Sequence, residues 1–123
     1  MFLLDIAVNL AAHDDNVRKQ FYVACVSKRR DGAIVVSVNG SSRAQPVPSA
    51  HAEIRALKKS GSDSVLYVAR VLRDKKTLAI AKPCKKCQAA IRNKRVLQVF
   101  FTVDDEFYGV WNVKKDAWRL KRY

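Results

Sequence analysis

Two short fragments of this sequence carry side chains that bind a transition metal and move protons. The first is His51-Ala52-Glu53, and the second is Pro83-Cys84-Lys85-Lys86-Cys87. Zinc in a catalytic site takes three protein ligands, imidazole and thiolate among them, and keeps a fourth position for water. The histidine supplies an imidazole and the two cysteines supply thiolates, so the sequence predicts one zinc ion per chain.

Glu53 lies two residues after the histidine, where its carboxylate can face a metal-bound water instead of the metal. Zinc lowers the pKa of such a water from about 15.7 to about 7. A carboxylate beside that water can accept its proton and later deliver it to a leaving group. Glu53 is therefore the predicted catalytic residue, because a purely structural zinc site has no use for it.

Each fragment taken alone has a simpler explanation. A His-x-Glu pair fits a helix in which the histidine is merely hydrogen-bonded, and Cys-x-x-Cys also occurs in redox and structural zinc sites. The chain holds three cysteines, Cys25, Cys84 and Cys87, so no second Cys-x-x-Cys pair completes a four-cysteine site. The odd number argues against a disulfide framework, and Cys25 is expected to be a small buried strand residue.

The elements that must position these side chains follow from hydrophobic periodicity and turn residues. Asp31-Gly32 predicts a hairpin turn between the first two strands. Pro83 fits the first position of a helix, because its missing N–H would be unpaired there. In chain order we expect a helix at 3–12, strands at 20–28 and 33–39, a loop at 40–50, a helix at 51–59, strands at 65–72 and 77–81, a helix at 83–93 and a strand at 96–103.

This order predicts an α/β fold of three layers, with helices on both faces of one mixed sheet. The first two strands form an antiparallel pair, and the helical crossovers make the following strands parallel. One domain is expected to span residues 1–123, since the sequence contains no linker or repeat. Its C-terminal segment, 104–123, is basic and aromatic, and Phe107–Val113 is expected to return as an antiparallel hairpin.

The charge of the chain points to a polyanionic partner. Lys and Arg number 24 against 11 Asp and Glu, which gives a net charge of +13. Such a charge repels itself within a small domain, so a nucleic acid or nucleotide partner is expected, with a solvated basic surface as the alternative. Residues 70–95 contain ten Lys or Arg and one acid, and among these cations Lys82, Lys85 and Lys86 flank the cysteines.

Aromatic residues gather towards the C-terminus. Seven of the eleven lie between Phe100 and Tyr123, where Trp118 and Tyr123 alternate with cations. Interleaved cations and rings suit a single strand, because cations follow phosphates and rings stack bases. For both aromatic residues, packing or an oligomer contact is the alternative. The predicted nucleic-acid contacts are therefore Lys82, Lys85, Lys86, Trp118 and Tyr123.

Nothing in the sequence indicates a membrane or a secretory route. No run of about 18 apolar residues is present, and no basic amphipathic helix indicates a membrane surface. The apolar start of the chain lacks a basic segment and contains Asp5, so a signal peptide is not expected. We therefore expect a cytoplasmic protein.

Taken together, the two fragments have the pattern H-x-E…P-C-x-x-C, and the sequence resembles the cytidine deaminase superfamily over roughly residues 3–103. The resemblance implies a five-stranded mixed sheet flanked by helices and the hydrolytic deamination of a nucleobase. By the same resemblance His51, Cys84 and Cys87 match the zinc ligands, and Glu53 matches the proton shuttle.

The resemblance also suggests where a substrate would lie. It matches Asn39 to an asparagine that contacts the sugar, and a turn residue before Gly40 is the alternative. The backbone N–H groups of Ala52 and Cys84 are placed near the base. The predicted substrate contacts are thus Asn39, Ala52 and Pro83.

The motifs also discriminate among branches of the superfamily. Free-nucleoside cytidine deaminases usually carry a cysteine where His51 stands, and tRNA adenosine deaminases typically carry a glutamate where Lys82 stands. Deoxycytidylate deaminases are usually longer and less basic. The sequence thus predicts conversion of cytosine to uracil in single-stranded DNA or RNA. The alternatives are a free cytidylate or deoxycytidylate deaminase, an adenosine or other amidine deaminase, and a catalytically idle zinc-bearing nucleic-acid module, with the oligomeric state left open.

Overall fold

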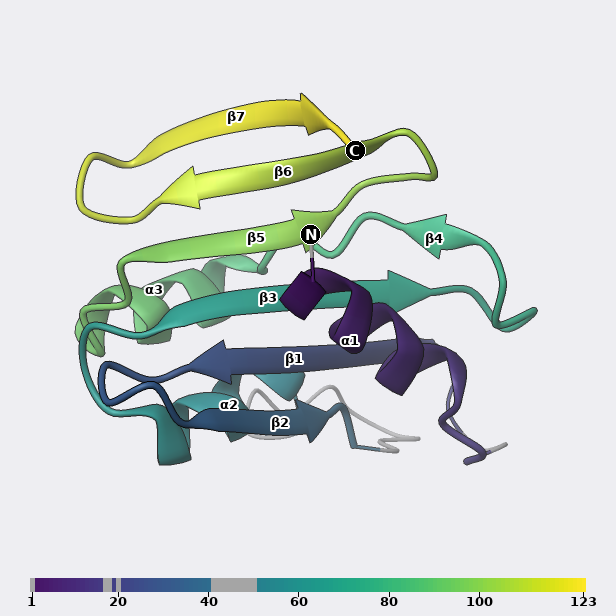
Figure 1. Cartoon of the computed structure of the whole chain (residues 1–123), viewed down its shortest axis with the longest axis horizontal. Coiled ribbons are helices and arrows are strands. Elements are labelled where there is room, and N and C mark those ends of the chain that lie inside the picture. The colour runs from purple at the N-terminus through teal and green to yellow at the C-terminus, as the bar shows by residue number, and fades with distance from the viewer. Residues whose placement is uncertain (1, 17–18, 20, 41–50) are drawn as a thin grey trace.

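A mixed β-sheet between helices forms the centre of the computed structural model, which describes residues 2–16, 19, 21–40 and 51–123 (Figure 1). The elements are α1 (Phe2–Ala12), β1 (Tyr22–Lys28), β2 (Ile34–Val38), α2 (Ala52–Ser60), β3 (Val65–Val71), β4 (Leu78–Ala79), α3 (Lys85–Asn93), β5 (Gln98–Thr102), β6 (Phe107–Asn112) and β7 (Ala117–Arg122). Within these described residues the sheet has seven strands, in the order β2-β1-β3-β5-β6-β7, and β4 pairs with β3.

The strand directions follow from the connections. β1 and β2 are antiparallel, and their turn is the predicted one, with Gly32 at φ +89° and the Asp31 carboxylate accepting the Ala33 N–H. β3 is antiparallel to β1 and parallel to β5. β2, β3 and β5 therefore run in one direction, as the helical crossovers predict.

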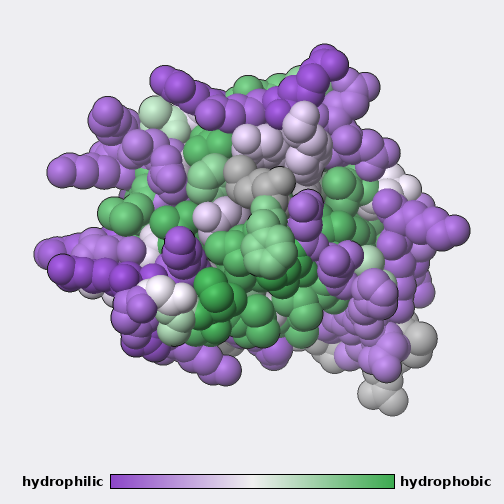
Figure 2. Space-filling model, in the orientation of Figure 1, coloured by the Kyte–Doolittle hydropathy of each residue, from purple (hydrophilic) through white to green (hydrophobic). Residues whose placement is uncertain are grey.

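The predicted three layers are confirmed. α1 lies over β1 and β3 on one face of the sheet, and α2 and α3 lie on the other face (Figure 1). On the α2/α3 face, the core includes Leu66, Val68, Val99, Phe101 and Trp111. On the α1 face, hydrophobic residues gather at the centre of the view and hydrophilic residues surround them (Figure 2).

None of the helices in the described part of the chain is long and apolar enough to cross a membrane.

The carboxyl ends of β3 and β5 are held apart by β4. The Thr102 hydroxyl accepts the backbone N–H of Arg70 at 3.1 Å and donates to the carbonyl of Ala79 at 2.8 Å. The Thr102 carbonyl accepts the N–H of Ala81 at 2.8 Å. The chain that leads to Pro83 therefore leaves the sheet from between these two strands, already bonded to β5.

Two expectations need correction. The sheet has seven strands instead of five, because β6, which was expected, is followed by an unpredicted β7. β7 could not be predicted because it buries little surface: Trp118 is half-buried and the other residues of the strand are exposed. The third helix begins at Lys85 instead of Pro83, because Cys84 keeps an extended backbone (φ −68°, ψ 168°) and is the N-cap. Of the predicted loop at 40–50, residues 41–50 lie outside the described residues.

Candidate metal centre and active site

His51 and Cys84 occupy equivalent positions, each as the N-cap of a helix. Both have an extended backbone directly before α2 and α3, and neither side chain caps its own helix. The imidazole and the thiol can therefore turn to a ligand that the two helix ends share. Cys87, in the first turn of α3, adds a second thiol and is buried, whereas Cys84 is exposed.

These three side chains meet in space with the geometry of a zinc site. Their donor atoms lie within 4.8 Å of one another. The Nδ1 atom of His51 is 3.1 Å from the Cys87 sulfur and 3.7 Å from the Cys84 sulfur. Zn–N and Zn–S bonds in a tetrahedral site place a nitrogen and a sulfur about 3.5 Å apart. The two distances lie on either side of this value, so the residues fit a zinc ion.

The protonation of the buried thiol is coupled to metal binding. Without a metal, burial raises the pKa of Cys87, and the nearby Glu53 carboxylate adds to the effect. Zinc binds the thiolate form, so metal binding must release this proton. The exposure of Cys84 leaves one side of the group open to solvent.

Glu53 lies beside the metal group, which consists of His51, Cys84 and Cys87, and is 6% exposed. Burial raises the pKa of its carboxyl group, while its own backbone N–H, His51 and Cys87 act in the opposite direction. Cys25 of β1 is fully buried in the same core and close enough for the charge of Glu53 to raise its pKa further, after burial itself. Cys25 is thus a buried strand residue, as expected, and does not belong to the metal group.

Hydrogen bonds that sequence reasoning missed fix the backbone around the group. The Ser37 hydroxyl donates to the carbonyl of Ala52 at 2.6 Å, which ties the start of α2 to β2. The Gln88 side-chain amide donates to the carbonyl of Pro83 at 2.8 Å, which fixes the Pro83–Cys84 peptide. Ala52 and Pro83 are both buried. The residue types gave no signal for these tethers, because each depends on how a strand or loop meets a helix.

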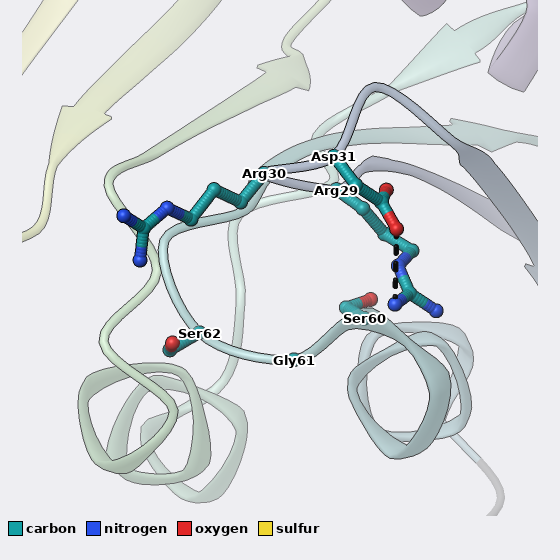
Figure 3. Close-up of a pocket in the computed structure, with 6 residues that line it drawn as sticks. All are labelled: Arg29, Arg30, Asp31, Ser60, Gly61 and Ser62. Carbon is teal, nitrogen blue, oxygen red and sulfur yellow. Dashed lines mark ion pairs between the residues drawn. The ribbon is translucent and has the colours of Figure 1, made fainter.

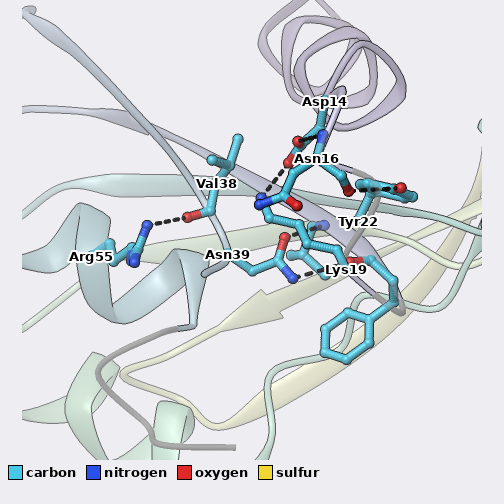
Figure 4. A network of polar contacts seen from close by, with 9 residues as sticks. Asp14, Asn16, Lys19, Tyr22, Val38, Asn39 and Arg55 are labelled. Carbon is cyan, nitrogen blue, oxygen red and sulfur yellow. Dashed lines mark hydrogen bonds and ion pairs between the residues drawn. The ribbon is translucent and has the colours of Figure 1, made fainter. Parts of the chain in front are cut away.

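Asn39 lies at the end of β2 and is 6% exposed. Its side-chain oxygen accepts the N–H of Val23 at 3.0 Å, and its amide nitrogen donates to the carbonyl of Phe21 at 3.1 Å (Figure 4). An ion pair between Lys19 and Asp14 lies nearby. The amide therefore holds the start of β1, and its contact with a sugar stays a prediction.

The predicted nucleic-acid contacts separate into two sets. Lys82, Lys85 and Lys86 are exposed and flank Cys84. Trp118 is half-buried and packs against the core on the α2/α3 face. Tyr123 is 47% exposed and packs on Tyr108, with ring centroids 5.3 Å apart, on the α1 face. The structure thus brings the three lysines to the metal group but leaves Tyr123 on the opposite face of the sheet.

A hollow of about 420 Å³ lies at the other end of α2 (Figure 3). The Arg29 guanidinium in it is paired with Asp31 at 3.2 Å and donates to the carbonyl of Lys59 at 3.1 Å. None of the residues that line this hollow belongs to the metal group. It is lined by Arg29, Arg30, Asp31, Ser60, Gly61 and Ser62.

A histidine and two cysteines at two helix N-termini, with a buried carboxylate beside them, define a zinc protein of the hydrolytic type. Residues 2–103 match the family described as the cytidine and deoxycytidylate deaminase zinc-binding region. The chain belongs to this family of zinc-dependent deaminases, which confirms the resemblance stated from the sequence. The match ends before β6 begins. A comparison with curated protein sequences gives no match.

Proposed function

We propose that this protein is a hydrolytic deaminase that converts cytosine to uracil in single-stranded nucleic acid. The observation that carries the proposal is the juxtaposition of Glu53, almost fully buried, with the group of His51, Cys84 and Cys87. A structural zinc site needs no titratable carboxylate at this position, so a catalytically idle zinc module is a poorer fit.

The reaction adds water to C4 of the base and releases ammonia, which leaves a carbonyl at C4. When bound, zinc supplies a water whose pKa lies near neutrality. Glu53 would accept one proton from the water and deliver it to the ring nitrogen. It would then carry the proton of the new C4 hydroxyl to the amine, so that ammonia departs and C4 keeps a carbonyl. Burial raises the pKa of Glu53, which suits a group that must hold a proton between two transfers.

The rest of the site positions these groups. Ser37 and Gln88 fix the two peptides that precede Glu53 and Cys84, and so hold the carboxylate and one ligand in register. The N–H groups at the N-cap and in the first turn of a helix have no partner within the helix. We expect the N–H groups of Ala52, the first residue of α2, and of Cys84, the N-cap of α3, to donate to the base. Asn39 is a candidate contact for the sugar.

A polynucleotide is the preferred substrate because positive charge extends well beyond a single phosphate site. The net charge is +13, and Lys82, Lys85 and Lys86 lie exposed beside the open side of the metal group. A free cytidylate or deoxycytidylate is the second candidate, since the same lysines can bind one phosphate. Localisation in the cytoplasm and the assembly state stay predictions.

The deciding experiment offers several substrates to one zinc-loaded preparation. Cytidine, dCMP, single-stranded DNA and single-stranded RNA, each containing cytosine, are compared for conversion to uracil and for ammonia release. The proposal expects the largest kcat/KM with a strand, falling as salt increases. Faster turnover of dCMP with little salt dependence would show that the substrate is the free nucleotide and not the strand. No conversion of any cytosine substrate would overturn the proposal.

A further inference from the structure

Four side chains form a continuous stack that links the C-terminal hairpin, which consists of β6 and β7, to the metal-binding loop that leads to Cys84. The indole rings of Trp111 on β6 and Trp118 on β7 stack at 4.5 Å with planes 4° apart. The Arg92 guanidinium lies 5.0 Å from the Trp111 ring centroid, and the Lys82 ammonium lies 4.5 Å from that of Trp118. Because the two indoles cover each other's inner faces, the two cations lie on the outer faces.

This arrangement leaves no face of Trp118 for a base. Trp111 covers one face and Lys82 the other. The ring of Phe101 meets Trp118 edge-on at 6.0 Å, which limits its rotation. Phe101 itself lies against Gly109, where a Cβ atom would come within 2.2 Å of its ring. Trp118 is therefore a fixed support for the ammonium group above it.

Lys82 also differs from the other cations that lie on aromatic rings of the hairpin. Arg92 is paired with Asp116 at 3.1 Å, and Arg122 is paired with Glu106 at 3.7 Å. Trp111 and then Arg92 donate hydrogen bonds to Asp116, and they lower the pKa of its carboxyl group. In the described part of the chain, no carboxylate lies within ion-pair distance of Lys82.

Lys82 stands two residues before the ligand Cys84, so the cation belongs to the segment that leads into the metal group. It is separated from Cys84 by the buried Pro83, whose carbonyl is held by Gln88. An ammonium group over an indole keeps its charge and has N–H donors directed away from the ring. Because the stack restricts the side chain beforehand, less entropy is lost when an anion binds.

We propose that Lys82, held on Trp118, binds the phosphate next to the base that enters the metal centre. The inference rests on the proposed function only in that the base lies at this metal group. Trp118 is a positioning residue for the lysine and makes no contact with a base. The phosphate belongs to a strand or to a mononucleotide, and the ligands of the test distinguish these two sources.

The first test compares Lys82→Met with Lys94→Met, which removes an equal charge from an exposed residue at the far end of α3. Affinities for cytidine, dCMP and a cytosine oligonucleotide are measured by titration in a Glu53→Gln background, in which turnover is too slow to consume the ligand. A lost charge-assisted phosphate contact should weaken dCMP or the oligonucleotide about tenfold and leave cytidine unchanged. The oligonucleotide's salt slope should fall by about 0.7. Lys82→Arg should restore binding, and Lys94→Met should resemble the parent.

The second test concerns Trp118 and uses a double-mutant cycle. Trp118→Leu should weaken phosphate binding when Lys82 is present and have no further effect in Lys82→Met. Trp118→Phe keeps an aromatic face and a foldable hairpin, and it should give an intermediate loss. If Trp118→Leu weakens oligonucleotide binding equally with and without Lys82, the ring stacks on a base and the inference is wrong.

The outcomes separate this inference from the proposed function. If Lys82→Met and Lys94→Met bind dCMP and the oligonucleotide equally well, the inference fails even when the parent enzyme deaminates cytosine. If the parent deaminates nothing, but phosphate binding still depends on Lys82 and Trp118, the proposed function fails and the inference stands. A loss confined to the oligonucleotide identifies a strand phosphate, and a loss with dCMP identifies a nucleotide phosphate.

Discussion

At the metal centre, the backbone positions His51 and Cys84, because each is the extended residue directly before a helix, α2 or α3. In the C-terminal hairpin, by contrast, Trp111 and Trp118 are placed by ring stacking and by a hydrogen bond to Asp116 in the turn. The family match includes the first region and ends at residue 103, before the second begins. The two regions meet at Lys82, which precedes the metal-binding loop and lies on the hairpin.

If Lys82 binds a phosphate as proposed, the zinc chemistry and the phosphate contact depend on different regions of the molecule. Ligands fixed by helix starts tolerate few changes, because the donors must lie within a short distance of one metal. In the hairpin, the two indole rings lie on β6 and β7, outside the helix starts that carry the ligands. We therefore expect changes at the metal centre to remove activity with little effect on the hairpin, and changes in the hairpin to alter stability and binding while zinc stays bound.

The largest expected effect comes from Glu53→Gln. The variant keeps the shape of the side chain but cannot accept a proton, so deamination should fall by about 10²–10⁴-fold. Zinc content and the unfolding midpoint should stay near those of the parent. The measurements are kcat on the best substrate and zinc per chain. Turnover close to that of the parent would show that Glu53 takes no part in proton transfer.

The next effect in size tests the hairpin through Trp111, which is fully buried. Trp111→Ala should lower the free energy of unfolding by about 3–5 kcal/mol, because truncation leaves a large cavity. Trp111→Phe, which retains a ring, should cost less. Denaturant titration measures both, with zinc content as the control. A change near zero for Trp111→Ala would show that the hairpin does not contribute to the core.

A smaller effect is expected from Gly109→Ala, because the new Cβ would meet the Phe101 ring at 2.2 Å. Overpacking of this kind costs about 1–3 kcal/mol of the free energy of unfolding. Phe101→Leu in the same chain should relieve most of the clash, which a double-mutant cycle detects. Additive losses in the double variant would show that the two residues do not interact.

The same contrast explains what the sequence could predict. The group of His51, Cys84 and Cys87 was predictable because zinc takes nitrogen and sulfur ligands and the two cysteines form a Cys-x-x-Cys pair. The spacing of two residues from His51 pointed to Glu53 as the neighbouring carboxylate, and its catalytic role stays a prediction. The predicted order of helices and strands up to residue 103 agrees with the structure, since buried faces leave a periodic pattern. The metal-binding residues could be recognised because each of the two fragments is only a few residues long.

Other features depend on contacts between distant segments. Ser37 could not be predicted as a tether, because its partner Ala52 is fixed only once β2 meets α2. β7 buries too little surface to show a strand pattern and forms by pairing with β6. Trp118 was predicted as a base-stacking or packing residue, and only the structure shows both of its faces covered. The stack of the two indole rings and two cations could be recognised only in the three-dimensional structure.

We expect His51, Cys84 and Cys87 to hold one zinc ion on which deamination depends. This expectation is tested most directly by stripping the protein with a chelator and measuring cytosine deamination as zinc is added back. We expect no activity without metal, a linear rise as zinc is added, and saturation at about one zinc per chain, with no recovery in Cys84→Ala. Activity that survives stripping, or full recovery in Cys84→Ala, would contradict it.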